Sequence, residues 1–109
     1  MADPQLTEFF TRMVSSFDPQ KAAGLDATIQ LNLTGDRSGS WYVTLKNQQC
    51  NLHEGTAPAA GLTVTANSED FMNIFTGKLD GMSAFMQGKL KVAGDMSLAM
   101  KLFNLFKMK

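Results

Sequence analysis

The sequence of 109 residues is poor in several features, and each shortage excludes a class of protein. It has one cysteine, so it cannot form an internal disulfide and is not a disulfide-stapled secreted scaffold. Its ten basic and ten acidic side chains cancel, which argues against a nucleic-acid binder acting through overall charge. Uninterrupted apolar runs are only a few residues long, too short to span a membrane. The first residues lack the basic and apolar regions of a signal peptide, so we expect a cytoplasmic location.

Side chains that carry catalysis or bind metals are equally scarce. The one cysteine, Cys50, and the one histidine, His53, lie three positions apart on a predicted strand and therefore point to opposite faces. They cannot form a nucleophile–base pair with each other. No group of histidine, cysteine and carboxylate residues has a spacing that would converge on a metal ion. We therefore expect no enzyme, no catalytic residue, no metal and no cofactor.

The apolar residues that are present change their period along the chain. A length of about 100–150 residues is one ordinary domain, so we expect a single domain over residues 1–109. Apolar side chains recur at helical spacing from Leu6 to Phe17, after an Asp3-Pro4 start and before Pro19. Alternating apolar and polar residues then predict strands over 25–34, 41–46, 50–54, 62–67 and 89–93, the first three forming an antiparallel meander.

Three further helices follow from capping signals. Ser68 is expected to cap a helix that buries Phe71, Ile74 and Phe75. Asp80 and Asp95 are expected to cap two more, the last of which runs toward the end of the chain. The glycines that stop the first two of these helices are Gly77 and Gly88.

The C-terminal third is both apolar and basic. Residues 77–109 carry six lysines and two aspartates, a net charge of +4, against −4 for the four basic and eight acidic residues of 1–76. The last predicted helix is apolar around nearly its whole circumference, whereas a surface helix needs one apolar face. The residues alone leave two interpretations open, a densely packed core or a cavity that takes an apolar ligand.

Three segments resemble the sterol carrier protein-2 domain family. They are Trp41–Asn47, Ser68–Lys78 and Ser83–Leu102, and the similarity extends over about residues 25–106. The resemblance implies an α+β fold in which helices pack on one face of a five-stranded mixed sheet and enclose a hydrophobic tunnel. It also implies non-enzymatic binding and transfer of fatty acids, fatty acyl-CoA or sterol-like molecules, without a cofactor.

The resemblance suggests a set of tunnel-lining residues rather than a catalytic constellation. Gln87 matches the family's glutamine and is the polar candidate for a ligand head group, although it can instead bond backbone at a helix end. The apolar candidates for the lipid-binding site, each of which could also be ordinary core, are Trp41, Phe75, Met82, Phe85, Met100, Phe103 and Phe106.

The partners expected on this basis are a lipid ligand and a transient contact with a membrane or a lipid enzyme, with no nucleic acid. Two alternatives remain: an accessory module that presents a lipid to a partner enzyme, and a protein-interaction or dimerisation domain without a lipid ligand. The chain ends Lys107-Met108-Lys109, unlike the peroxisomal tripeptide of many eukaryotic relatives, which also favours the cytoplasm. The particular lipid and the oligomeric state do not follow from the sequence.

Overall fold

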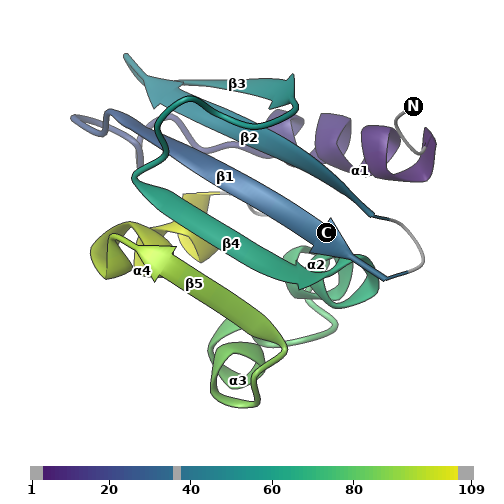
Figure 1. Cartoon of the computed structure of the whole chain (residues 1–109). Coiled ribbons are helices and arrows are strands. Elements are labelled where there is room, and N and C mark those ends of the chain that lie inside the picture. Colours follow the sequence, from purple (N-terminus) through teal and green to yellow (C-terminus); the bar gives the residue numbers. More distant parts are fainter. Residues whose placement is uncertain (1–3, 36–37, 106–109) are drawn as a thin grey trace.

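The computed structural model describes residues 4–35 and 38–105 as four helices and five strands (Figure 1). Their order agrees with the sequence-based expectation of a helix, a meander, a fourth strand, two helices, a fifth strand and a last helix. The elements are α1 (Pro4–Ser15), β1 (Ala27–Thr34), β2 (Gly39–Lys46), β3 (Gln49–Glu54), β4 (Leu62–Asn67), α2 (Ser68–Phe75), α3 (Gly81–Met86), β5 (Leu90–Gly94) and α4 (Met96–Leu105).

The five strands form one mixed sheet in the order β3-β2-β1-β4-β5. β1 and β4 are parallel, and every other neighbouring pair is antiparallel. β2 turns into β3 through Asn47 and Gln48, both with positive φ (53° and 59°), the backbone of a two-residue hairpin. β5 lies at one edge of the sheet and β3 at the other. The predicted α+β fold with a five-stranded mixed sheet is confirmed.

One face of the sheet is covered by helices. Figure 1 shows α1, α2 and α4 behind the sheet, with α3 beside the end of β5. Alternate residues of β1, such as Ile29 and Leu31, point into this layer and are fully buried. The core is richest in aromatic side chains beneath α1, where the ring centroids of Phe10 and Trp41 lie 4.9 Å apart. Those of Phe9 and Phe71 lie 5.8 Å apart. The predicted apolar stripe of the first helix is therefore core.

The opposite face is polar, and the β3–β4 loop crosses it. Gln30, buried on this face, holds the loop through its side-chain amide. Its Nε2 donates to the carbonyl oxygens of Trp41 and Gly55 at 3.1 Å each. Its Oε1 accepts a hydrogen bond from the backbone N–H of Ala57 at 2.7 Å. This buried amide fixes the long connection that β3 needs to reach the far side of β1.

Helix caps differ from the expectation at one position. The cap of α2 is Asn67, whose Oδ1 accepts from the N–H of Glu69 at 2.9 Å, so the assignment of Ser68 was wrong. Asn67 has the extended backbone of a cap, whereas Ser68 is the first helical residue and is buried. Asp80 caps α3 as expected.

No helix within residues 4–35 and 38–105 has the length and hydropathy needed to cross a membrane.

Candidate functional site

An apolar groove of about 150 Å³ lies at the β5 edge of the sheet, where α3, β5 and α4 meet. Every side chain that lines it is apolar. The lining residues are Met82 and Phe85 of α3, Leu90 and Val92 of β5, and Met96, Ala99 and Met100 of α4.

Helical spacing on α3 and α4 and strand alternation on β5 bring these residues together. Met82 and Phe85 are three apart and therefore share one face of α3. Leu90 and Val92 are two apart and share the inner face of β5. On α4 the spacing is i, i+3 and i+4, which again describes one helical face. The groove is thus a product of the turns that orient three short elements.

Those turns are fixed by backbone hydrogen bonds and caps. The Oδ2 atom of Asp80 accepts from the N–H of Ser83 at 2.9 Å at the start of α3. Asp95 caps α4, because its Oδ1 accepts from the N–H groups of Ser97 at 2.9 Å and Leu98 at 3.2 Å. Gly94, the last residue of β5, has φ +114°, and a Cβ there would meet the carbonyl oxygen of Gly61. Glycine is therefore required where the chain leaves the sheet for α4.

The groove has a buried floor and an exposed rim. Leu90 and Ala99 form the floor and are 2% and 4% exposed. The rim side chains Met82, Phe85, Met96 and Met100 are 43%, 37%, 47% and 50% exposed. Large apolar side chains that remain half-exposed on two neighbouring helices are typical of a binding surface. The sequence-based observation that the last helix has a surplus apolar face is accounted for here, since Met96 and Met100 lie on it.

Two larger hollows have a different chemistry. One of about 440 Å³ lies between α1 and α2 and is lined in part by Glu8, Arg12 and Lys78. Another, of about 290 Å³, lies where β4 leads into α2 and includes Asp70 and Lys89 among its lining residues. Both are larger than the groove but present charged groups that an apolar ligand would have to desolvate. We therefore take the smaller, wholly apolar groove as the candidate site.

The structure brings three of the predicted lining residues together and places two elsewhere. Met82, Phe85 and Met100 all line the groove. Trp41 and Phe75 are 4% and 5% exposed and belong to the aromatic core. Trp41 lies against Phe10 of α1, far along the sheet from the β5 edge. Their apolar character is accounted for by core packing.

The remaining predicted residues have other placements. Gln87 is exposed at the C-terminal cap of α3, where its backbone N–H donates to the carbonyl of Ser83 at 2.9 Å. It does not line the groove. Phe106 and the side chain of Phe103 lie outside the part of the chain that the structure describes.

Sequence reasoning missed four of the lining residues: Leu90, Val92, Met96 and Ala99. Each belonged to a recognised apolar pattern, the strand alternation of β5 or the helical spacing of α4. Those patterns signal which face of an element is apolar, but not which other element it meets.

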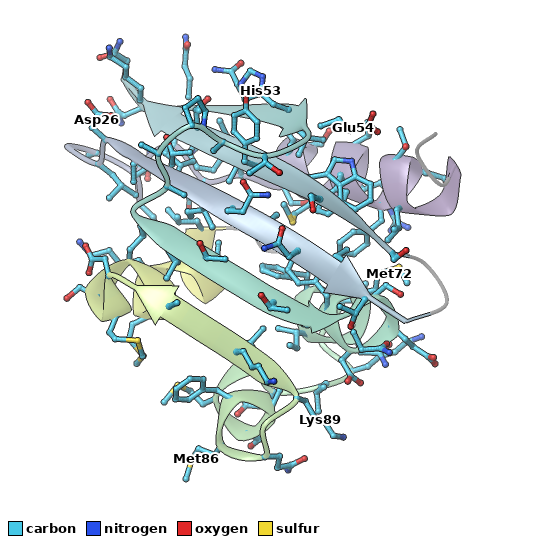
Figure 2. All side chains as sticks on the ribbon, in the orientation of Figure 1. Asp26, His53, Glu54, Met72, Met86 and Lys89 are labelled. Atoms are coloured by element: carbon cyan, nitrogen blue, oxygen red, sulfur yellow. The ribbon has the colours of Figure 1, made fainter. Side chains whose placement is uncertain are left out.

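Cys50 and His53 do not form a reactive pair. His53 lies on the polar face, where its ring stacks on Tyr42 with centroids 4.8 Å apart (Figure 2). Cys50 packs against the core on the other face, and its burial raises the pKa of the thiol from 9.0 to about 11. Within residues 4–35 and 38–105, no group of three histidine, cysteine or carboxylate residues could hold a metal ion.

Known proteins resemble this chain over nearly its whole length. Residues 6–107 match the SCP-2 sterol transfer family. The hydroxysteroid dehydrogenase-like protein 2 of Danio rerio is 36% identical over 98% of the chain, and the chain covers 27% of that protein. Sterol carrier protein 2 of Homo sapiens is 38% identical over 79% of the chain, which covers 16% of the human protein. The chain therefore spans about a quarter or less of these relatives.

A solved structure shares the same fold. The solution structure of palmitated SCP2L2 from Aedes aegypti superposes with a TM-score of 0.70 at 30% identity, covering 95% of this chain and 93% of the mosquito protein.

Proposed function

The chain belongs to the SCP-2 sterol transfer family, and on that premise we propose that it binds the apolar part of a lipid in the groove between α3, β5 and α4. The function class, lipid binding and transfer, is that of the family. The ligands we propose are fatty acids, fatty acyl-CoA and sterol-like molecules, taken up without covalent chemistry.

The observation that carries this proposal is the wholly apolar lining of a groove whose rim is exposed. Burying an apolar ligand there releases water from four half-exposed side chains at no cost in polar desolvation. The volume of about 150 Å³ is comparable to cavities that admit a benzene-sized molecule. A long acyl chain needs more room, which the unbranched rim methionines can provide by changing rotamers.

The first experiment is native mass spectrometry of the freshly purified protein, followed by organic extraction and identification of any bound mass. We expect a lipid adduct, or an apo protein whose melting temperature rises when fatty acid is added. A ligand at a hundred times its Kd stabilises the folded state by about 2.7 kcal/mol. A clean apo mass without any thermal shift would favour a protein-interaction domain instead.

The groove is tested by two matched aspartate variants. Met100→Asp puts a carboxylate on the groove rim, whereas Met86→Asp puts one on an exposed α3 side chain that does not line the groove. We expect the first variant to weaken the binding of a fluorescent fatty acid by tenfold or more and the second to leave it unchanged. Equal affinities of the two folded variants would place the ligand elsewhere.

A second candidate function is presentation of a lipid to an enzyme. Its support is the length of the relatives, since this chain covers 27% of the dehydrogenase-like protein and 16% of the human sterol carrier protein. Under either function we propose a transient contact with a membrane or a lipid enzyme, supported by the excess of lysines in residues 77–109. Transfer of a fluorescent fatty acid to acceptor vesicles, with and without anionic lipid, separates free transfer from presentation.

A cytoplasmic location is also part of the proposal. The single cysteine is a free thiol, which fits a reducing compartment. Fractionation of the source cells, followed by immunodetection of the protein, tests this location.

A further inference from the structure

The rim of the groove consists largely of methionine. Met82, Met96 and Met100 contribute three of the seven lining side chains, one from α3 and two from α4. They are 43%, 47% and 50% exposed, so reagents in the surrounding water can reach them. Solvent-accessible methionine is the thioether that oxidants attack first, and reductases restore it.

We propose that these three methionines make the groove a redox-sensitive site, which releases its apolar ligand when they are oxidised by a hydroperoxide. In the step, a lone pair of the thioether sulfur attacks one peroxide oxygen. The O–O bond breaks and an S–O bond forms, and the departing hydroxide takes the proton from the transferred oxygen. Methionine thereby becomes methionine sulfoxide, and hydrogen peroxide becomes water. Sulfur loses two electrons and the peroxide gains them. Reversal requires a methionine sulfoxide reductase and a dithiol, which becomes a disulfide as water is released.

The apolar lining of the groove explains why oxidation should weaken ligand binding. A sulfoxide carries a strong dipole whose oxygen accepts hydrogen bonds, and the seven lining side chains offer no N–H or O–H donor. An apolar ligand seated over the sulfoxide would strip water from it without replacing the lost hydrogen bonds. We expect the affinity for such a ligand to fall by roughly tenfold or more when the rim is oxidised.

Other methionines of the same chain provide internal references. Met86 is 81% exposed on α3 but does not line the groove, so it should be oxidised readily without affecting the ligand. Its side chain points away from the sheet and into solvent in Figure 2. Met13 is fully buried in the core beneath α1 and should stay reduced while the protein is folded. Oxidation of Met13 would therefore report unfolding.

This inference rests on the proposed lipid binding, so the test begins with the reduced protein. A dansyl-labelled fatty acid is titrated before and after hydrogen peroxide treatment and desalting, and peptide mass spectrometry locates each sulfoxide. The wild type is compared with M86L and with the triple variant M82L/M96L/M100L, because exchange of methionine for leucine conserves volume and polarity. Circular dichroism confirms that each sample is folded.

We expect oxidised wild type and oxidised M86L to bind at least tenfold more weakly than the same protein before oxidation. The triple variant, whatever its own reduced affinity, should bind equally before and after oxidation. Treatment with methionine sulfoxide reductases A and B and dithiothreitol should restore the wild type. The inference is overturned if the oxidised wild type binds as tightly as the reduced protein, or if the triple variant loses affinity equally. Failure of the reduced wild type to bind any fatty acid would instead overturn the proposed function, and this inference with it.

Discussion

Filling the groove from its floor should weaken ligand binding and stabilise the protein at the same time. Ala99 is 4% exposed and lines the groove from α4, where leucine is a favourable helical residue. Ala99→Leu adds three carbon atoms that can enter the space of about 150 Å³ now open beside this position. Most core substitutions that enlarge a side chain destabilise the fold, so the stabilisation expected for Ala99→Leu is unusual.

The gain in the free energy of unfolding can be estimated from the burial of these three carbons. At about 0.8 kcal/mol for each buried CH₂ group, three carbons give at most about 2.4 kcal/mol. The groove is open to water along its rim, so roughly half of that burial is realised, about 1 kcal/mol. In a domain of this size such a gain raises the melting temperature by roughly 4–8 °C.

The assay combines thermal unfolding with titration of a fluorescent fatty acid. We expect Ala99→Leu to melt at a higher temperature and to bind the fatty acid at least tenfold more weakly. Ala93→Leu is the matched control, because Ala93 is exposed on β5 and does not line the groove. A folded Ala99→Leu variant with wild-type affinity would refute the assignment of the site, and a lower melting temperature would refute the claim that space is available there.

Further predictions at three residues test the fold that supports the groove. Gln30→Met keeps the volume of a buried side chain but removes its hydrogen bonds to Trp41, Gly55 and Ala57. Urea unfolding should show a loss of about 2–4 kcal/mol in the free energy of unfolding. A loss below ~0.5 kcal/mol would contradict the role of Gln30 in holding the β3–β4 loop. Gly94→Ala would force β5 away from the Gly61 carbonyl and weaken both folding and ligand binding, more than Gly55→Ala, where φ is also positive but space is free. Because the pKa of Cys50 is raised to about 11, its thiol should react with iodoacetamide at pH 8 far more slowly in the folded protein than in urea. The unfolded thiol ionises near pH 9 while the folded thiol stays neutral, so the free energy of unfolding should fall between about pH 9 and 11, and C50A should lose this dependence.

The sheet and its helices could be predicted because their patterns are local. Alternation in residues 62–67 predicts β4 with its observed bounds, and the Asp80 and Asp95 caps lie where the sequence places them. The cap of α2 was misassigned because Asn67 and Ser68 are adjacent residues of equal capping ability. The extended backbone at Asn67, which cannot be seen from the residue types, decides between them.

The groove could be predicted only in part, for a different reason. Apolar residues at helical spacing look alike whether they pack in a core or line a cavity. Trp41 and Phe85 are both aromatic members of apolar patterns, yet one is 4% exposed beneath α1 and the other is 37% exposed on the groove rim. Their difference arises from the elements that lie opposite them, since α1 covers the inner face near β2 and leaves the β5 edge to α3 and α4.

The sequence by itself determined the element order, the family and the apolar surplus of the last helix. These depend on periodicity, caps and motifs within about twenty residues of one another. Only the tertiary structure decided that β5 is an edge strand and that the surplus face of α4 opens beside it. Strand order is set by long-range pairing, such as that of Ile29 in β1 with Leu62 in β4. Such pairing depends on how whole faces bury against each other. The groove lies at the β5 edge, where the helices no longer cover the sheet completely. No local sequence pattern can locate that edge.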